Sequence, residues 1–415
     1  MPGGTHPNLL GEEDLRSRVQ RLAELDRESG GAGEHAAAEL IAADLRACGA
    51  RVELEPARVH GTYWWPIGLT SATALLAALA RRRWAAPIAA LAAGAAVDDI
   101  NLGPRLVRRA LPQKTTHNVV AEFGDPAAPR TLVFLAHYDA AHSGLVFEPR
   151  FPRALMRAFP VLQRAKTTPP TMWGAVYGPL LAAVGLLWRR PSLRRLGALL
   201  SGGYLAAMID IGLRPVVPGA NDNATGVVAL LSLARALAAE PPPGLRVLLV
   251  FPGSEESFME GMVAWARRHL GRLHDDSTYF VCLDTVGSPR LMLLEGEGML
   301  RIRDYPRELL ELVHEVGAQA GVEVLRGLRF RNATDALIPL KAGYPTVMLG
   351  SVDEYKLPTD YHWPTDTADR ATYSSVADAA RLSWGVVRRL ASLPSPAGDG
   401  RITGSGVSAR AGAAP

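Results

Sequence analysis

The stretch TLVFLAHYD, residues 131–139, predicts a buried β-strand that ends in a polar cluster. Apolar residues 132–136 lead directly into His137 and Asp139. These two residues are two positions apart, so their side chains point to the same face if the strand continues. In open α/β sheets, ligands bind at the carboxyl ends of strands. We therefore expect His137 and Asp139 to belong to a functional site.

The rest of the chain alternates between strand-like and helix-like segments. The expected strands are residues 51–59, 117–123, 131–137, 246–251, 279–284, 290–294 and 344–349. The expected helices are residues 10–28, 34–48, 223–239, 259–270, 307–320 and 374–393. This alternation predicts an α/β fold in which a mixed central β-sheet is sandwiched between helices.

Composition excludes several classes of protein. Lys plus Arg exceeds Asp plus Glu by only four, and no basic block with interleaved aromatic residues is present, so we expect no nucleic-acid partner. The two cysteines, Cys48 and Cys282, provide neither a disulfide framework nor a Cys-type zinc site. Residues 9–28 are charged and lack the apolar segment of a cleavable signal peptide.

Two pairs of uncharged segments interrupt the α/β pattern. Each pair consists of a long run, an arginine-rich tip and a shorter run: residues 61–80 and 84–97 in the first pair, and 167–188 and 196–209 in the second. We expect each pair to form a helical hairpin. The expected domains are one α/β domain, two hairpin insertions and a disordered tail: residues 1–60, 111–166 and 215–394; 61–110; 167–214; and 395–415.

Four further motifs place polar residues at the end of a predicted strand, in a loop or at the start of a helix. They are GANDNATG (219–226), GSEES (253–257), LDTVG (283–287) and YHWPTDT (361–367). An aspartate at the start of a helix is by itself an ordinary N-cap. Glu255 and Glu256, however, repel each other at the end of an apolar strand, which indicates a bound cation or different roles for the two carboxylates. Two histidines and three carboxylates, taken from these motifs and His137, are a ligand set that suits zinc.

His137-x-Asp139 and these four motifs, in this order, resemble the M28 family of zinc aminopeptidases. The resemblance covers residues 30–56 and 116–393 apart from the two hydrophobic pairs, and it implies the zinc-aminopeptidase (phosphorylase/hydrolase-like) fold. It also implies two Zn²⁺ ions. The implied roles are terminal zinc ligands for His137, Glu256, Asp284 and His362, a bridging ligand for Asp222, the general base for Glu255, and orientation of His137 for Asp139.

The resemblance further implies hydrolysis of peptide bonds at a free N-terminus through a water that bridges the two zinc ions. Metals about 3.5–4 Å apart lower the pKa of such a water towards about 7. Two alternatives stay open: a carboxypeptidase or cyclase-like relative, and a catalytically silent binding or receptor domain. The complete ligand set and Glu255 argue against a silent domain. Members of the family often have histidine after Ser/Thr-Asp, whereas Ala336 follows Thr334-Asp335 here, which leaves specificity open.

The hydrophobic pairs predict a membrane partner. Runs of twenty and twenty-two uncharged residues are long enough to cross a hydrocarbon core of about 30 Å as helices. Runs of fourteen give only about 21 Å and require charged flanks that extend towards the headgroups. The alternative is an alanine-rich helical subdomain packed on the enzyme. The richness in Gly and Ala and the flanking tryptophans favour the membrane.

The hydrophobic pairs do not indicate a transporter, because they contain no polar intramembrane pairs. If residues 117–123 and 131–137 pair as a hairpin, both insertions leave the sheet on the side of the expected site. The catalytic cleft would then open close to the membrane or beneath these helices. The side of the membrane and the oligomeric state stay open.

Overall fold

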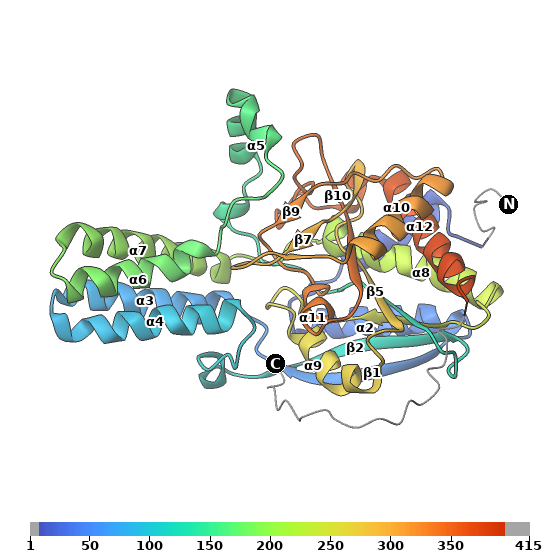
Figure 1. Cartoon of the computed structure of the whole chain (residues 1–415), viewed down its shortest axis with the longest axis horizontal. Coiled ribbons are helices and arrows are strands. Elements are labelled where there is room, and N and C mark those ends of the chain that lie inside the picture. Colours follow the sequence, from blue (N-terminus) through green and yellow to red (C-terminus); the bar gives the residue numbers. More distant parts are fainter. Residues whose placement is uncertain (1–7, 395–415) are drawn as a thin grey trace, which may run out of the picture.

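The computed structural model describes residues 8–394, so the tail predicted at 395–415 lies outside the described residues. A seven-stranded sheet has the order β1-β2-β4-β3-β5-β10-β6 (Figure 1). Its strands are β1 (Arg51–Val59), β2 (Lys114–Gly124), β3 (Thr131–Leu135), β4 (Arg246–Phe251), β5 (Thr278–Leu283), β6 (Arg290–Leu293) and β10 (Thr346–Val352). β4, β3, β5 and β10 run parallel, whereas β2 and β6 are antiparallel to their neighbours.

The position of β2 corrects the expected pairing. β2 pairs with β1 and β4, and β3 lies between β4 and β5. The expected hairpin of residues 117–123 with 131–137 is therefore wrong. β3 is buried along its whole length, as is typical of a central parallel strand, whereas β2 alternates between buried and partly exposed positions. Because β2 is antiparallel to β4, its start still lies at the edge of the sheet where β3 ends.

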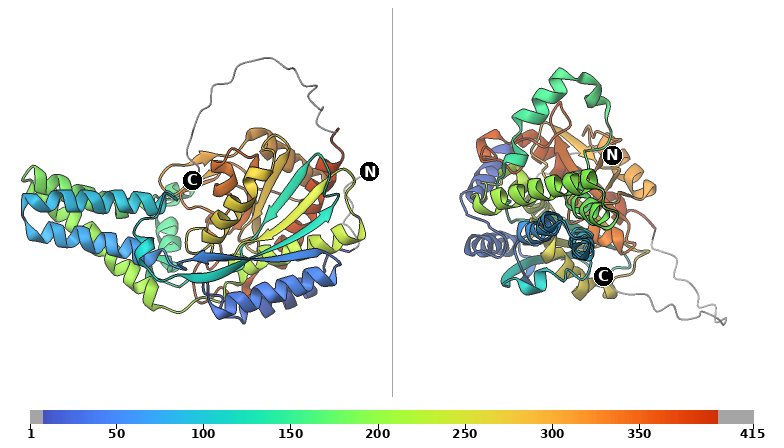
Figure 2. Two further views of the ribbon diagram at one scale, coloured as in Figure 1. Left: turned by 90° about the horizontal axis from the view of Figure 1, so that it is seen from below. Right: turned by 90° about the vertical axis from the view of Figure 1, so that its left-hand side faces the viewer.

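Helices cover both faces of the sheet (Figure 2). One layer contains α1 (Glu12–Ala23), α2 (Ala32–Ala47), α8 (Thr225–Ala239), α10 (Arg307–Gln319) and α12 (Tyr373–Ala391). On the other face, α9 (Glu260–His269) contacts β1 and β2, with α11 (Leu337–Lys341) beside it. The predicted fold class, a mixed sheet sandwiched between helices, is confirmed.

Four further helices pack together and project from the α/β domain (Figure 1). They are α3 (Trp64–Ala80), α4 (Ala86–Ile100), α6 (Trp173–Leu187) and α7 (Pro191–Leu213). We call them the helical bundle. Arg108 holds its base to the domain: the buried guanidinium binds both carboxylate oxygens of Asp99, at 2.6 and 3.0 Å, and donates to the carbonyl of Ser257 at 2.7 Å. The domain boundaries given above stay a prediction.

Several short elements gave no sequence signal, because they are too brief to show a hydrophobic period. The short helices are η1 (Arg83–Ala85), η2 (Arg108–Ala110), η3 (Leu145–Phe147), α5 (Arg150–Ala158), η4 (Pro160–Arg164), η5 (Ala220–Ala224), η6 (Leu270–Arg272) and η7 (Ala368–Arg370). A second sheet, of order β8-β7-β9, contains β7 (Gly296–Glu297), β8 (Arg303–Asp304) and β9 (Arg329–Phe330).

Glu297 in β7 predicts a pH-dependent stability. The side chain is fully buried and accepts hydrogen bonds from the backbone N–H and the hydroxyl of Thr334. Burial raises the pKa of Glu297 to about 8. The folded protein then holds a proton that the unfolded chain has lost, so the free energy of unfolding falls as pH rises towards 8, by at most about 1.4 kcal/mol per pH unit for this group.

Glu297→Gln cannot ionise and should remove this contribution. Urea unfolding of chelator-treated wild type and variant at pH 5, 6, 7 and 8 measures the difference. The wild type should lose stability relative to the variant across this range. Parallel pH profiles for the two proteins would contradict the prediction.

Candidate metal centre

Four neighbouring parallel strands carry the predicted site residues at one edge of the sheet. His137 follows β3, Glu255 and Glu256 follow β4, and Asp284 follows β5. His362 lies in the loop after β10, and Asp222 lies just before α8. All of these side chains are buried. The structure therefore brings together the residues that the sequence scatters over more than two hundred positions.

The carboxylate of Asp222 lies between two imidazoles. Its Oδ1 is 3.3 Å from Nε2 of His137, and its Oδ2 is 3.2 Å from Nε2 of His362. Asp284 is on the side of His137, with Oδ2 at 3.8 Å from the same Nε2. Glu256 is on the side of His362, with Oε2 at 3.2 Å from Nε2. These contacts divide the arrangement into two halves, and Asp222 contacts the imidazole of each.

These spacings fit bound zinc. Ligand atoms about 2.0–2.1 Å from a tetrahedral ion lie about 3.3 Å from one another, close to the 3.2–3.3 Å that separate Asp222 from the two imidazoles. In each half, one ligand atom from each of three residues lies within 4.8 Å of the others. Oε1 of Glu256 is buried and has no hydrogen-bond partner, so a cation would satisfy it. The imidazole and carboxylate donors are those that zinc prefers.

The adjacent glutamates differ in their surroundings. Glu256 forms an ion pair with His362, whereas no ion pair links the carboxylate of Glu255 to any described residue. Glu255 still lies at the site, because its carboxylate, Glu256 and His137 offer ligand atoms within 4.8 Å of one another. Burial raises the pKa of Glu255 well above its usual value, and the neighbouring carboxylates raise it further against the opposing effect of His137. The structure therefore gives the two glutamates different surroundings, a distinction that their spacing in the sequence could not provide.

Asp139 mainly holds the turn that carries these glutamates. Its Oδ1 accepts a hydrogen bond from the backbone N–H of Glu255 at 2.9 Å, and its Oδ2 accepts one from Glu256 at 3.1 Å. The hydroxyl of Ser29 donates to the same Oδ2 at 2.7 Å. Nδ1 of His137 lies farther away, at 3.4 Å. The carboxylate therefore fixes the backbone after β4 at least as firmly as it orients the imidazole.

Asp366 and Arg27 support the loop of Asp222, and neither was predicted as a site residue. Asp366 accepts from the backbone N–H groups of Asn221, at 2.7 Å, and Asp222, at 3.1 Å. The fully buried Arg27 donates to the carbonyls of Tyr138 and Gly219 at 3.1 and 2.7 Å. Asp366 lies within the YHWPTDT motif, which was the available signal. Arg27 lies in a charged segment that gave none.

Asp335 is another residue of this region that the sequence did not assign. It is buried, and neither of its carboxylate oxygens has a hydrogen-bond partner. Burial raises the pKa of Asp335 well above its usual value. Burial likewise raises the pKa of Asp284 to about 7, and the nearby carboxylates add to the shift. Both shifts reflect the concentration of negative charge at this edge of the sheet.

The imidazoles respond in the opposite sense. Burial alone would lower the pKa of His362, but the carboxylates of Glu256 and Asp222 outweigh it and raise the pKa to about 10. The pKa of His137 is also raised, because Asp139 and Asp222 outweigh burial. Protons therefore compete with a metal for both imidazoles, and metal affinity should increase with pH.

A narrow pocket leads to the two half-sites. Its cavity volume is about 30 Å³, room for about one water molecule. Its apolar walls are Phe330, Met348 and Pro358. The ring of Phe147 in η3 lies 4.6 Å from that of His362. Access to the site is therefore restricted by residues from the segment that leads from β3 to the bundle.

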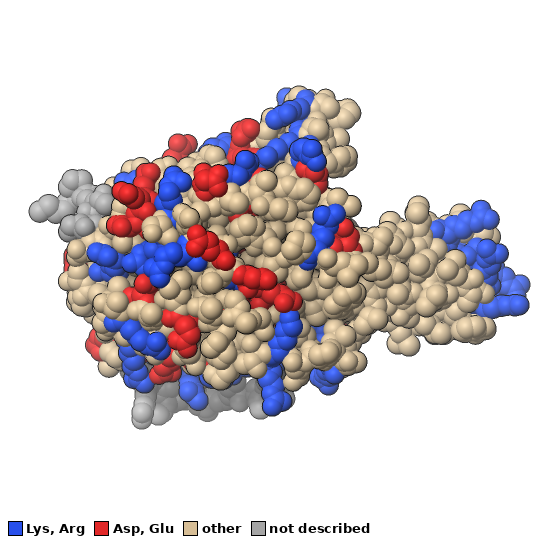
Figure 3. Space-filling model, turned by 180° about the vertical axis from the view of Figure 1, so that it is seen from behind, with Lys and Arg blue, Asp and Glu red and all other residues tan. Residues whose placement is uncertain are grey.

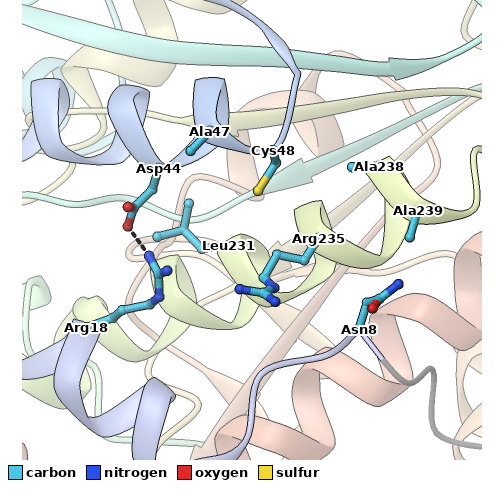
Figure 4. A pocket seen from close by; sticks show the side chains of 9 residues that line it. All are labelled: Asn8, Arg18, Asp44, Ala47, Cys48, Leu231, Arg235, Ala238 and Ala239. Atoms are coloured by element: carbon cyan, nitrogen blue, oxygen red, sulfur yellow. Dashed lines mark hydrogen bonds and ion pairs between the residues drawn. The ribbon is translucent and has the colours of Figure 1, made fainter.

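A larger pocket lies elsewhere, between α1, α2 and α8 (Figure 4). Its cavity volume is about 460 Å³. The carboxylate in it, Asp44, is paired with Arg18. Since a metal centre needs several ligands, this pocket does not provide one, and the smaller pocket marks the candidate site.

Solved structures with the same fold include exopeptidases and glutaminyl cyclases. A Zn-dependent exopeptidase from Parabacteroides distasonis ATCC 8503 has a TM-score of 0.55 at 13% identity, covering 91% of this chain and 98% of that chain. A leucine aminopeptidase precursor from Bacteroides thetaiotaomicron VPI-5482 has a TM-score of 0.53 at 14% identity, covering 92% and 97%. A glutaminyl cyclase from Bacteroides thetaiotaomicron has a TM-score of 0.55 at 14% identity, covering 92% and 98%. These similarities establish the fold.

A comparison with family models agrees with the motifs. The sequence model of the family described as Peptidase family M28 matches residues 208–387, which contain four of the five motifs. This match confirms the resemblance to the M28 family. No curated protein matches this chain. The family match supports a hydrolase, and the buried His/Asp/Glu cluster could hold a metal ion.

Asp366→Ala should weaken zinc binding without abolishing it. The substitution leaves the backbone N–H groups of Asn221 and Asp222 without their acceptor, so the loop no longer holds Asp222 in place. Loss of such a supporting residue typically lowers metal affinity by about 10–100-fold. Competition with a chromogenic chelator measures the affinity. Asp304→Ala, at an exposed carboxylate of β8, is the control. Equal affinities for the two variants would contradict a supporting role for Asp366.

Proposed function

We propose that this protein is an aminopeptidase that uses two zinc ions. The observation that carries the proposal is the position of Asp222, whose two oxygens face His137 and His362 separately. His137 and Asp284 would hold one ion, His362 and Glu256 the other, and Asp222 both. Bound zinc would lower the pKa of a water molecule towards about 7 and polarise the carbonyl of the scissile bond.

Glu255 is the proposed general base. It lies beside the two half-sites, and its carboxylate is not engaged in an ion pair with any described residue. Glu255 would accept a proton from the attacking water and deliver it to the nitrogen of the leaving amine. Burial raises its pKa, which favours the protonated form that the second step needs. Asp139 keeps Glu255 in place through the backbone bond of 2.9 Å.

The shape of the pocket supports exopeptidase action. The apolar walls formed by Phe330, Met348 and Pro358 would have to separate to receive the side chain of a terminal residue, because the cavity has room for about one water molecule. An endopeptidase, by contrast, requires an open cleft through which a chain passes. The apolar walls favour uncharged side chains at the N-terminus of the substrate.

Two other functions, cyclisation of N-terminal glutamine and binding without catalysis, are compatible with the same fold. Glutaminyl cyclases are among the structural neighbours, and a silent binding domain would keep the fold without turnover. A panel of aminoacyl-p-nitroanilides, N-acetylated peptides and N-terminal glutaminyl peptides, with and without chelator, separates the three. Chelator-sensitive release from free N-termini supports the proposal. Cyclisation alone, or a zinc-loaded protein inert to the whole panel, overturns it.

Glu255→Gln should abolish most turnover while it preserves zinc binding. The amide keeps the size of the side chain but cannot accept the proton, so kcat should fall by about 10²–10⁴-fold. The release of p-nitroaniline gives kcat, and metal analysis of the purified variant gives its zinc content. An unchanged kcat would eliminate Glu255 as the base.

Asp284→Ala should lower the zinc content from about two ions per chain towards one. The substitution removes a ligand on the side of His137 only, so the half that contains His362 and Glu256 is left intact. Metal analysis after dialysis against a weak chelator measures the stoichiometry. Wild type with one ion, or a variant that keeps both, would contradict the two-ion site.

A further inference from the structure

The helical bundle is packed with small residues inside and large apolar residues outside. The bundle has a small hydrophobic core of its own, separate from the core of the α/β domain. Its buried residues are Ala77, Ala78, Ala85, Ala86, Ala89, Ala182, Ala183 and Leu186. Large side chains on the same helices are exposed, among them Leu76 (67%), Leu91 (74%) and Leu199 (73%). A water-soluble bundle has the opposite distribution, with leucines inside and charges outside. Helices in lipid pack through small residues, because lipid tails are as apolar as leucine.

Helices α6 and α7 approach so closely that side chains would not fit between them. A Cβ added to Gly197 would lie 2.3 Å from the backbone nitrogen of Ala182, and one added to Gly185 would lie 2.3 Å from that of Arg194. A Cβ on Gly178 would lie 2.8 Å from the hydroxyl of Ser201. Gly197 and Ser201 are four residues apart, the small-xxx-small spacing of helix pairs in membranes.

Charge is confined to the two ends of the bundle. We call the part of the bundle between its two ends the shaft. The shaft has no charged residues on the face shown in Figure 3, and basic residues gather at the tip, the end far from the α/β domain. The tip contains Arg81, Arg82, Arg83, Arg189, Arg190, Arg194 and Arg195. No acidic residue occurs within residues 61–97 or 167–209. At the end near the α/β domain, by contrast, acids pair with bases: Asp99 with Arg108, and Asp210 with Arg214.

The shaft has the length of a bilayer core. At 1.5 Å per residue, the 23 residues of α7 extend about 34 Å and the 17 of α3 about 25 Å. Among the described residues, α7 is the one helix both long and apolar enough to cross a membrane, and only 22% of its apolar window is buried in the protein. The shorter helices match a core of about 30 Å when the tip arginines extend towards the headgroups.

We propose that α3, α4, α6 and α7 together cross a lipid bilayer, with the arginine tip on the cytoplasmic face and the α/β domain on the opposite side. Exposed leucines then contact acyl chains, and the arginines contact anionic headgroups. The orientation follows from the arginines in the two short tip loops, since basic residues in short loops stay in the cytoplasm. The proposal concerns the surface of the bundle and does not depend on the peptidase activity.

This placement brings the metal centre to the membrane surface. The backbone N–H of Leu145 donates to Asp210 near the end of α7 at 2.6 Å, and Phe147, two residues later, contacts the ring of His362. Phe151 (72% exposed) and Val161 (64% exposed) belong to the segment that continues from there, and α5 stands beside the base of the bundle (Figure 1). These side chains would lie among the headgroups on the domain side, so the substrate would reach the pocket along the membrane.

Acidic substitutions on the exposed apolar face test the bilayer contact. On a water-soluble bundle, Leu91→Asp plus Leu199→Asp would be harmless, because exposed positions tolerate polar residues. In a bilayer, each acid opposes insertion. The full chain is expressed, and membranes are washed with alkaline carbonate. The wild type and the control Ala127→Asp, in the exposed turn before β3, should stay in the pellet, whereas the double variant should lose most of the pelleted protein.

Reconstitution checks that the variant has folded. Detergent-purified double variant should bind zinc like the wild type but fail to float with vesicles of phosphatidylethanolamine and phosphatidylglycerol. Three outcomes overturn the proposal: a wild type that is soluble without detergent, a soluble oligomer that pairs the apolar faces of two copies, or a double variant that still floats.

Cysteine labelling tests crossing and orientation. Arg190→Cys at the tip and Ala127→Cys in the domain are introduced separately with Cys48→Ser, while the buried Cys282 is kept. A membrane-impermeant maleimide applied to intact cells should label position 127 but label position 190 only after permeabilisation. Labelling of both positions in intact cells, or of position 190 alone, would overturn the proposed crossing or its orientation.

Discussion

Mutual repulsion among buried carboxylates is the main physical constraint at the candidate site. Asp222, Glu255, Glu256, Asp284 and Asp335 lie buried at one edge of the sheet. Burial and the like charges nearby raise the pKa of every member except Asp222, whose pKa is lowered because the hydrogen bonds from two imidazoles outweigh burial. Such a concentration of acid persists in a fold only when protons or cations compensate it. Divalent ions do so most completely, and they also supply chemistry.

The buried charged residues around the site form hydrogen bonds with the backbone of the site loops. Asp139 accepts from the backbone of Glu255 and Glu256, and Asp366 accepts from the backbone of Asn221 and Asp222. Arg27 joins the end of β3 to the loop before α8. Because buried charged groups tie these loops to one another, they hold the loop conformations that place the ligands. Geometry of this precision is what metal coordination requires.

The bundle and the site share one edge of the sheet for a topological reason. β2 begins, and β3 and β4 end, at that edge, so the segments that precede β2 and follow β3 both leave there. Arg108 links the bundle directly to the site, because it binds Asp99 at the end of α4 and the carbonyl of Ser257 next to Glu256. The helices that face away from the domain are thus anchored to the turn that carries the glutamates.

The amino-acid sequence alone predicted the strands of the main sheet, the long helices of the α/β domain and the motifs that resemble the M28 family. These features depend on hydrophobic period and on turn chemistry, which are local properties of the chain. It also singled out His137, Asp222, Glu255, Glu256, Asp284 and His362 as candidate site residues, because each follows a recognisable strand, stands in a motif or begins a helix. It did not determine the neighbour of β2, where an expected hairpin was wrong.

The folded structure was needed to learn how distant segments meet. It placed Asp335 beside the carboxylates, assigned Asp366 and Arg27 to the loop of Asp222, and distinguished Glu255 from Glu256 by their different partners. It also showed that the bundle turns its alanines inward and its leucines outward. Each of these facts is a contact between residues far apart in the chain, and no local pattern encodes which of many possible partners a side chain finds once the sheet has closed around it.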